Sequence, residues 1–174
     1  MAADIVTGPS EWVANIIRRH TLRDVRVVYH GIDGLRPSIV GSGAVLWNKT
    51  RVDAVCDPRP VAEVARLLPD VHFEATFMPD GVTLPNVHVV GKEPHEVAML
   101  RVDHASVYLA TTRETFGIGT LEALAAGVPV VGYRWGGQPE IIEHMRDGYL
   151  AAPGDVQDLA RGIRWALAYR DAIK

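Results

Sequence analysis

Apolar residues recur along this chain with two different periods, and segments of the two kinds follow one another. Between residues 71 and 77 every second residue is apolar, which predicts a strand with one buried face close to the edge of a sheet. Between residues 156 and 166 apolar residues recur every three or four positions, which predicts a helix. Mostly apolar runs at residues 105–110 and 128–132 predict strands of the buried type.

The alternation of strand and helix continues over residues 37–170. Further strands are predicted at residues 39–47 and 86–90, and further helices at residues 60–68 and 94–101. A repeated order of strand and helix is typical of a parallel sheet covered by helices on both faces. The pattern therefore predicts an α/β fold with a Rossmann-like, doubly wound parallel sheet.

The first 36 residues have a separate pattern. A short strand is predicted at residues 2–7, a helix at residues 11–20 and a second strand at residues 25–29. The second strand ends in the loop sequence His30-Gly31-Ile32-Asp33. The helix would present the apolar residues Trp12, Ile16 and Ile17.

Composition excludes several classes of protein. The chain has 174 residues and a net charge of −3, so no general attraction to nucleic acid is expected. The single cysteine, Cys56, excludes an internal disulfide and a cysteine-based zinc site. No secretion signal and no apolar run of about 20 residues is present, so we expect a cytoplasmic protein.

Two glutamates eight positions apart, Glu114 and Glu122, carry the most specific chemistry of the sequence. Glu114 follows the strand predicted at residues 105–110, and Glu122 lies about one turn inside the helix that comes next. The N-terminus of that helix favours an anion, above all a phosphate. The two carboxylates would repel phosphate, so we expect them to accept hydrogen bonds from sugar hydroxyls on either side of it. A ligand in which a sugar, phosphates and a second sugar follow one another is a nucleotide-sugar.

An ordered string of about sixty residues around these glutamates resembles a known family. It comprises ETFGIGTLEALAAGVPVVGY from Glu114, the Gly136-Gly137-x-x-Glu140 turn and the segment 148–155. The string is similar to the E-x7-E signature of the retaining glycosyltransferases of the GT-B fold, family four, also called group one. The resemblance implies that residues 37–174 are the nucleotide-sugar-binding domain, one half of a GT-B fold.

The resemblance also assigns the first residues of the chain. Residues 1–36 resemble a remnant of the acceptor-side domain and the crossing between the two domains. We therefore expect the rest of an N-terminal domain to be missing and the chain alone to be inactive. Apolar surface left by that domain would allow self-association. Full-length enzymes of this kind can be peripheral to the membrane.

Site residues can be carried over position by position. Lys49 and Arg51 occupy the place of the basic pair that holds the diphosphate, although the family spaces this pair about five residues apart. Two solvated loop cations are the alternative. Glu122 would bind the ribose, or be an ordinary surface glutamate. Glu114 would face the donor sugar, or cap the helix.

Backbone groups would complete the site. Backbone N–H groups are expected from the following residues: Phe116, Gly117 and Ile118 toward the sugar, and Thr120 and Leu121 toward the phosphates. Gly91 and Lys92 resemble the loop beside the base, and Gly31 lies at the crossing; a simple turn is the alternative for each glycine. Gly136-Gly137 would permit positive φ near the sugar. Glu140 is expected to cap the helix that follows it.

The absence of two metal-binding motifs narrows the predicted function. The sequence has no Asp-x-Asp pair for a metal-held diphosphate and no His-Glu-x-x-His. The predicted function is metal-independent, cofactor-free transfer of a sugar from a UDP-, GDP- or ADP-sugar to a glycan, lipid or small-molecule acceptor. One alternative is a non-catalytic nucleotide-sugar-binding module or inactive partner subunit. Another is a GT-B epimerase or phosphorylase.

Overall fold

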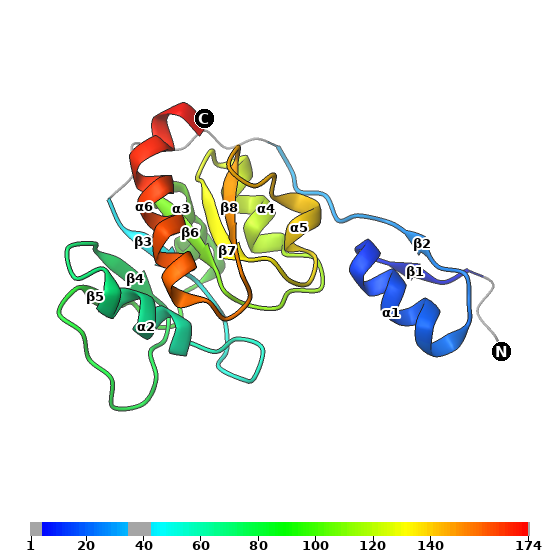
Figure 1. Cartoon of the computed structure of the whole chain (residues 1–174), viewed down its shortest axis with the longest axis horizontal. Coiled ribbons are helices and arrows are strands. Elements are labelled where there is room, and N and C mark those ends of the chain that lie inside the picture. Colours follow the sequence, from blue (N-terminus) through cyan, green and yellow to red (C-terminus); the bar gives the residue numbers. More distant parts are fainter. Residues whose placement is uncertain (1–4, 35–42, 174) are drawn as a thin grey trace.

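The computed structural model describes residues 5–34 and 43–173, and its centre is a six-stranded parallel sheet (Figure 1). The strand order is β5-β4-β3-β6-β7-β8, and all five pairings are parallel. The strands are β3 (Val45–Trp47), β4 (Phe73–Ala75), β5 (Val87–Val89), β6 (Val107–Ala110), β7 (Val130–Tyr133) and β8 (Gly148–Ala151). This order is that of a Rossmann-like fold, so the predicted fold class is confirmed.

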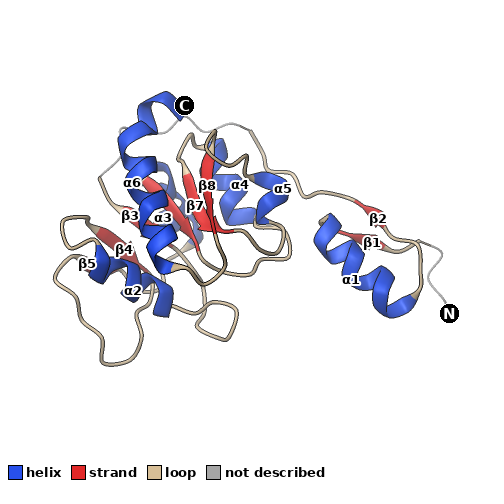
Figure 2. Ribbon diagram, in the orientation of Figure 1, coloured by secondary structure: helices blue, strands red, loops and turns tan. Residues whose placement is uncertain are grey.

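Helices cover both faces of the sheet (Figure 2). One face packs against α2 (Arg59–Leu67) and α6 (Val156–Ile173), through side chains such as Trp47 and Leu109. The other face packs against α3 (His95–His104) and α4 (Ile118–Ala125), through the alternate residues Leu46 and Tyr108. Because successive strand residues point to opposite faces, the apolar runs at these strands bury both sides of the sheet.

The alternating strand, β4, has one buried face and is the second strand from the edge, which agrees with its prediction; β5, with its partly exposed residues, is the edge strand on that side. Other elements depart from the prediction. β8 was not predicted, because it begins at Gly148 directly after Asp147, and an Asp-Gly pair is typical of a turn. Helix α3 continues to His104, three residues beyond its predicted end. Residues 2–4 and 39–42 of the predicted strands lie outside the described residues.

The N-terminal residues form a small βαβ unit beside the main sheet, seen at the right of Figure 1. β1 (Thr7–Gly8) and β2 (Arg26–Val27) pair in parallel, and α1 (Glu11–Thr21) connects them. Ile16 is 39% exposed, and Trp12 and Ile17 are half-buried. Among the described residues, no helix is both long and apolar enough to cross a bilayer.

A buried hydrogen bond joins the ends of the two central strands. The indole N–H of Trp47, the last residue of β3, donates to Thr111 Oγ1 at 3.0 Å, directly after β6. Both side chains are buried. This bond therefore fixes the two strand ends from which the loops of Lys49 and Glu114 start.

Replacing Thr111 by Val should lower the free energy of unfolding by about 1–3 kcal/mol, because the Trp47 N–H loses its buried acceptor. Urea unfolding measures the change. Tyr133→Phe is the matched control: it also removes a hydroxyl, but the Tyr133 oxygen is buried without a hydrogen-bond partner in the described structure. Equal losses in both variants would contradict this role of Thr111.

Candidate functional site

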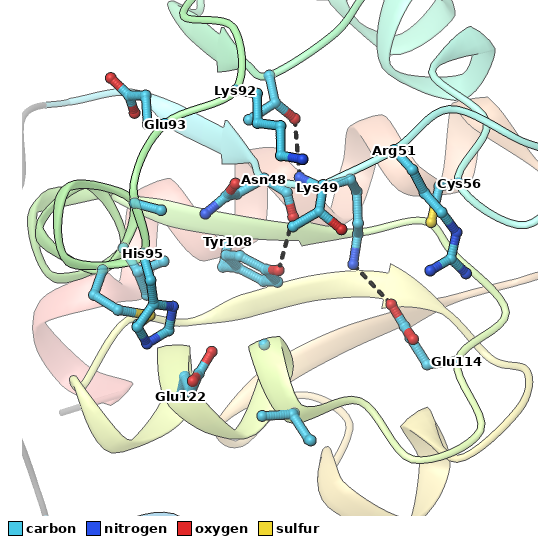
Figure 3. Close-up of a pocket in the computed structure, with 17 residues that line it drawn as sticks. Asn48, Lys49, Arg51, Cys56, Lys92, Glu93, His95, Tyr108, Glu114 and Glu122 are labelled. Carbon is cyan, nitrogen blue, oxygen red and sulfur yellow. Dashed lines mark hydrogen bonds and ion pairs between the residues drawn. The ribbon is translucent and has the colours of Figure 1, made fainter.

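A cavity of about 600 Å³ lies at the carboxyl ends of β3 and β6, where the strand order reverses. Ligands of open α/β sheets bind at this position. Figure 3 shows its principal side chains. Six residues predicted for the site line the cavity: Lys49, Arg51, Lys92, Glu114, Ile118 and Glu122.

An ion pair between Lys49 and Glu114 is the central contact of the cavity (Figure 3). The Lys49 ammonium donates to Glu114 Oε1 at 2.8 Å. The side chains are 11% and 30% exposed, so Lys49 is not a solvated loop cation. The loop that carries Lys49 is held at the neighbouring strand, because the Lys49 N–H donates to Thr76 Oγ1.

Mutual attraction keeps both partners charged. Burial alone would lower the pKa of Lys49, but the interactions with Tyr108 and Glu114 raise it above its ordinary value. Burial alone would raise the pKa of Glu114, but the Lys49 ammonium and the Thr112 hydroxyl bring it below its ordinary value. The cavity therefore contains a fixed positive charge at neutral pH, with its counter-charge on the adjacent loop.

Arg51 supplies a second cation in a more open place. Its side chain is 63% exposed, and its Nε donates to Asp53. Asp53 also accepts the N–H groups of Cys56 and Val55, and these bonds, with Arg51, lower the pKa of Asp53 to about 2. The loop thus presents one buried and one exposed cation two positions apart.

Helix α4 begins at the edge of the cavity, as predicted. Its N-cap, Gly117, has a φ of 113°, a conformation that side chains other than glycine rarely adopt. The first intrahelical bond runs from the Leu121 N–H to the Gly117 carbonyl at 3.1 Å. The N–H groups of Ile118, Gly119 and Thr120 precede it and have no intrahelical acceptor.

The Leu121 N–H, which was predicted to face the phosphates, donates within the helix ladder in this structure. Five other predicted residues lie outside the cavity lining: Gly31, Gly91, Phe116, Gly117 and Thr120. The Thr120 hydroxyl is buried and donates to Gln138 Oε1. Phe116 is buried against the rings of Tyr29 and His30.

The base-side loop has one residue in the cavity. Gly91 has a φ of 73° with open space around its Cα, as a turn glycine does, and Lys92 lines the cavity. Glu93, next in the chain, also lines it and is held by two hydrogen bonds from Arg101.

Tyr108 lines the cavity and was missed by sequence reasoning. It lies in the middle of β6, where it reads as a buried strand residue, yet its hydroxyl reaches the cavity beside Asn48 (Figure 3). A methyl group on Gly119 would come within 2.6 Å of that hydroxyl. Gly119 therefore gives Tyr108 the space to lie between Lys49 and Glu122.

The turn at Gly136-Gly137 packs against the loop that carries Glu114. The Gly137 N–H donates to the Glu114 carbonyl at 3.0 Å. A methyl group on Gly136, whose φ is 59°, would overlap with the same carbonyl. The prediction for Glu140 is wrong: it lies inside α5 (Gln138–Ile141), and its carboxylate accepts the N–H groups of Glu11 and Trp12 at the start of α1.

Comparison with known families agrees with this geometry. The family model for glycosyl transferases group 1 matches residues 83–172, which is half of the chain. This chain belongs to the group 1 glycosyltransferases. The matched range contains Glu114, Glu122 and the Gly136-Gly137 turn.

Individual relatives and solved structures agree. N-acetyl-alpha-D-glucosaminyl L-malate synthase of Bacillus anthracis is 33% identical over 115 residues, 64% of this chain and 27% of that protein. Sucrose-phosphate synthase of Thermosynechococcus elongatus superposes with a TM-score of 0.83 at 21% identity, over 98% of this chain and 50% of that one. A structure of TarM from S. aureus in complex with UDP superposes with a TM-score of 0.80 at 17% identity, over 97% of this chain and 39% of that chain. The chain spans about a quarter to a third of the curated relatives it matches.

Lys49→Met should lower the free energy of unfolding by about 1–3 kcal/mol at pH 7, because it leaves the Glu114 carboxylate half-buried without its cation. The folded-state pKa of Glu114 is lowered, so its contribution is present above its ordinary pKa and is lost as the pH falls through the folded value. The difference between the variant and the parent should therefore shrink below about pH 4.

Urea unfolding at a series of pH values makes this measurement. Arg146→Met is the control, because the ion pair of Arg146 with Glu143 is exposed on both sides and should matter far less. A Lys49→Met effect that is equal at pH 3 and pH 7 would show that the methylene packing of Lys49, not its charge, stabilises the loop.

Proposed function

We propose that this chain is the donor-binding part of a retaining, metal-independent glycosyltransferase. It would transfer a sugar from a nucleotide-sugar to a glycan, lipid or small-molecule acceptor. Residues 37–174 would hold the donor, and residues 1–36 would end the acceptor-side domain. The observation that carries the proposal is the Lys49–Glu114 ion pair beside the N-terminus of α4.

The leaving diphosphate would lie against the positive groups of the cavity. When the bond between the sugar's anomeric carbon and the diphosphate breaks, negative charge grows on the phosphate oxygens. The Lys49 ammonium and the N–H groups at the start of α4 are preorganised donors for that charge. Arg51 is exposed at the entrance and can approach the diphosphate from the solvent side.

Lys49 can serve the phosphate without leaving Glu114. An ammonium has three N–H donors, and Glu114 Oε1 takes one of them. The remaining donors are free to turn toward a phosphate oxygen. Glu114 would in this way orient Lys49 and also accept a hydrogen bond from the donor sugar.

Configuration would be retained by attack on the face from which the diphosphate departs. The acceptor hydroxyl forms the new bond to the anomeric carbon as the old bond breaks, and its proton passes to the departing phosphate oxygen. In this arrangement Glu122 accepts the ribose hydroxyls one helical turn away. Because the acceptor domain would be needed for attack, we expect the chain alone to bind nucleotide and transfer sugar slowly or not at all.

A thermal-shift panel of UDP, GDP, ADP and their sugars tests the donor site. The ligand that binds best, at about 100 times its dissociation constant, should stabilise the chain by about 2.7 kcal/mol, or roughly 5–10 °C. The solved TarM complex makes UDP the first choice. Glu122→Gln should remove most of this shift, because it replaces an ionised acceptor of ribose hydroxyls by an amide.

Glu63→Gln is the matched control, since Glu63 is exposed on α2, on the other face of the sheet. A Glu122→Gln variant that responds as strongly as the parent chain would refute the ribose assignment. Absence of any shift with all the nucleotides would refute the donor site as a whole.

A further inference from the structure

The N-terminus of helix α1 is capped by the carboxylate of Glu140, a residue of α5. The Glu11 N–H donates to Glu140 Oε2 at 2.7 Å, and the Trp12 N–H donates to Glu140 Oε1 at 2.9 Å. The Tyr29 hydroxyl, after β2, donates to Glu140 Oε2 at 3.3 Å. The first N–H groups of a helix have no intrahelical acceptor and carry its positive dipole end, so a carboxylate is well matched to them. One side chain of α5 thus holds the βαβ unit of residues 5–34.

A second contact runs from the same end of α1 to the loop of Glu114. Ser10, the N-cap of α1, is buried and accepts the Val13 N–H at 3.2 Å. The same hydroxyl donates to the Thr115 carbonyl at 2.6 Å. Next to Thr115, the Phe116 ring lies 5.3 Å from the ring of His30, edge to face. The N-terminal unit therefore contacts the loop directly beside Glu114.

The opposite side of this loop rests on the turn that leads into α5. The Gly137 N–H donates to the Glu114 carbonyl, and a methyl group on Gly137 would lie 2.7 Å from the Phe116 carbonyl oxygen. Glu140 follows in the next turn of chain. The loop of residues 114–116 therefore lies between the glycine turn and the N-terminus of α1, and Glu140 connects the two.

We propose that Ser10 and Glu140 are positioning residues for Glu114. They link the placement of the N-terminal unit to the conformation of loop 114–116. Release of this link lets the loop move away, and Glu114 leaves its place beside Lys49. The nucleotide end of the cavity is unaffected, because Glu122 lies inside α4, a helix that packs on the sheet through the buried Ala123.

This inference rests on the proposed function only in what it expects for ligand binding, where the sugar and the nucleotide should be affected differently. Loss of the link should weaken the contribution of the donor sugar to binding and leave the contribution of the nucleotide. The acceptor side of the enzyme would then influence sugar binding through α1. The contact itself is independent of any ligand and can be tested without one.

The first test is hydrogen–deuterium exchange of the unliganded chain, with variants Glu140→Ala and Ser10→Gly. Glycine is tolerated at an N-cap, so Ser10→Gly removes the bond to Thr115 and preserves the helix. Amides of residues 114–117 should exchange at least about tenfold faster in both variants, whereas those of α6 should not change. Faster exchange in α1 alone, or in neither segment, would overturn the proposal.

The second test compares UDP with the UDP-sugar that binds best, by titration calorimetry. In both variants the dissociation constant of UDP should stay within about twofold, and the extra affinity given by the sugar should fall about fivefold or more. Glu143→Ala is the matched control: it lies three residues further along, and its carboxylate pairs with Arg146 and, among the residues that the structure describes, not with α1. Equal losses for UDP and UDP-sugar, or no loss, would overturn the proposal. A parent chain that binds no nucleotide refutes the proposed function instead, and the exchange result still decides the link.

Discussion

The ion pair between Lys49 and Glu114 is the contact on which the site depends. The two residues are 65 positions apart and follow the neighbouring strands β3 and β6. Parallel pairing of these strands places both loops at one edge of the sheet, and the bond from Trp47 to Thr111 fixes the strand ends. A half-buried pair is costly to form unless both partners are held in place. The surrounding structure supplies that restraint through Thr76 on one side and Thr112 on the other.

The loop of Glu114 is itself held by contacts on two sides, from the turn before α5 and from the start of α1. Glycines at 136 and 137 allow one backbone to lie directly against another, which any side chain would prevent. On the far side Ser10 closes the contact from α1. In this way Glu114, one of the four side chains that we propose to face the ligand, is positioned by backbone contacts and by the start of a helix.

Much of the fold follows from local pattern in the sequence. Buried parallel strands require apolar runs and their helices require an apolar stripe, so β6, β7 and α6 could be recognised from their residues alone. The edge strand β8 could not, since it begins at Gly148 directly after Asp147, and an Asp-Gly pair is typical of a turn. The fold class was predictable because the order of the elements, not their exact ends, decides it.

The site was predictable in its residues but less so in its contacts. Lys49 and Glu114 were each recognised, yet their pairing depends on which strands are neighbours. Tyr108 was missed because a cavity residue on a central strand has the same pattern as a core residue. Glu140 was assigned to its own helix, whereas its partners are 128 and 129 residues away. Capping by a distant carboxylate leaves no local signal in the sequence.

The most direct test of the central claim is a crystal structure of the chain with a bound UDP-sugar. The account predicts the diphosphate within hydrogen-bond distance of the Lys49 ammonium and of the first N–H groups of α4, with Glu114 beside the sugar. A diphosphate bound elsewhere, with Lys49 still paired to Glu114 alone, would contradict it.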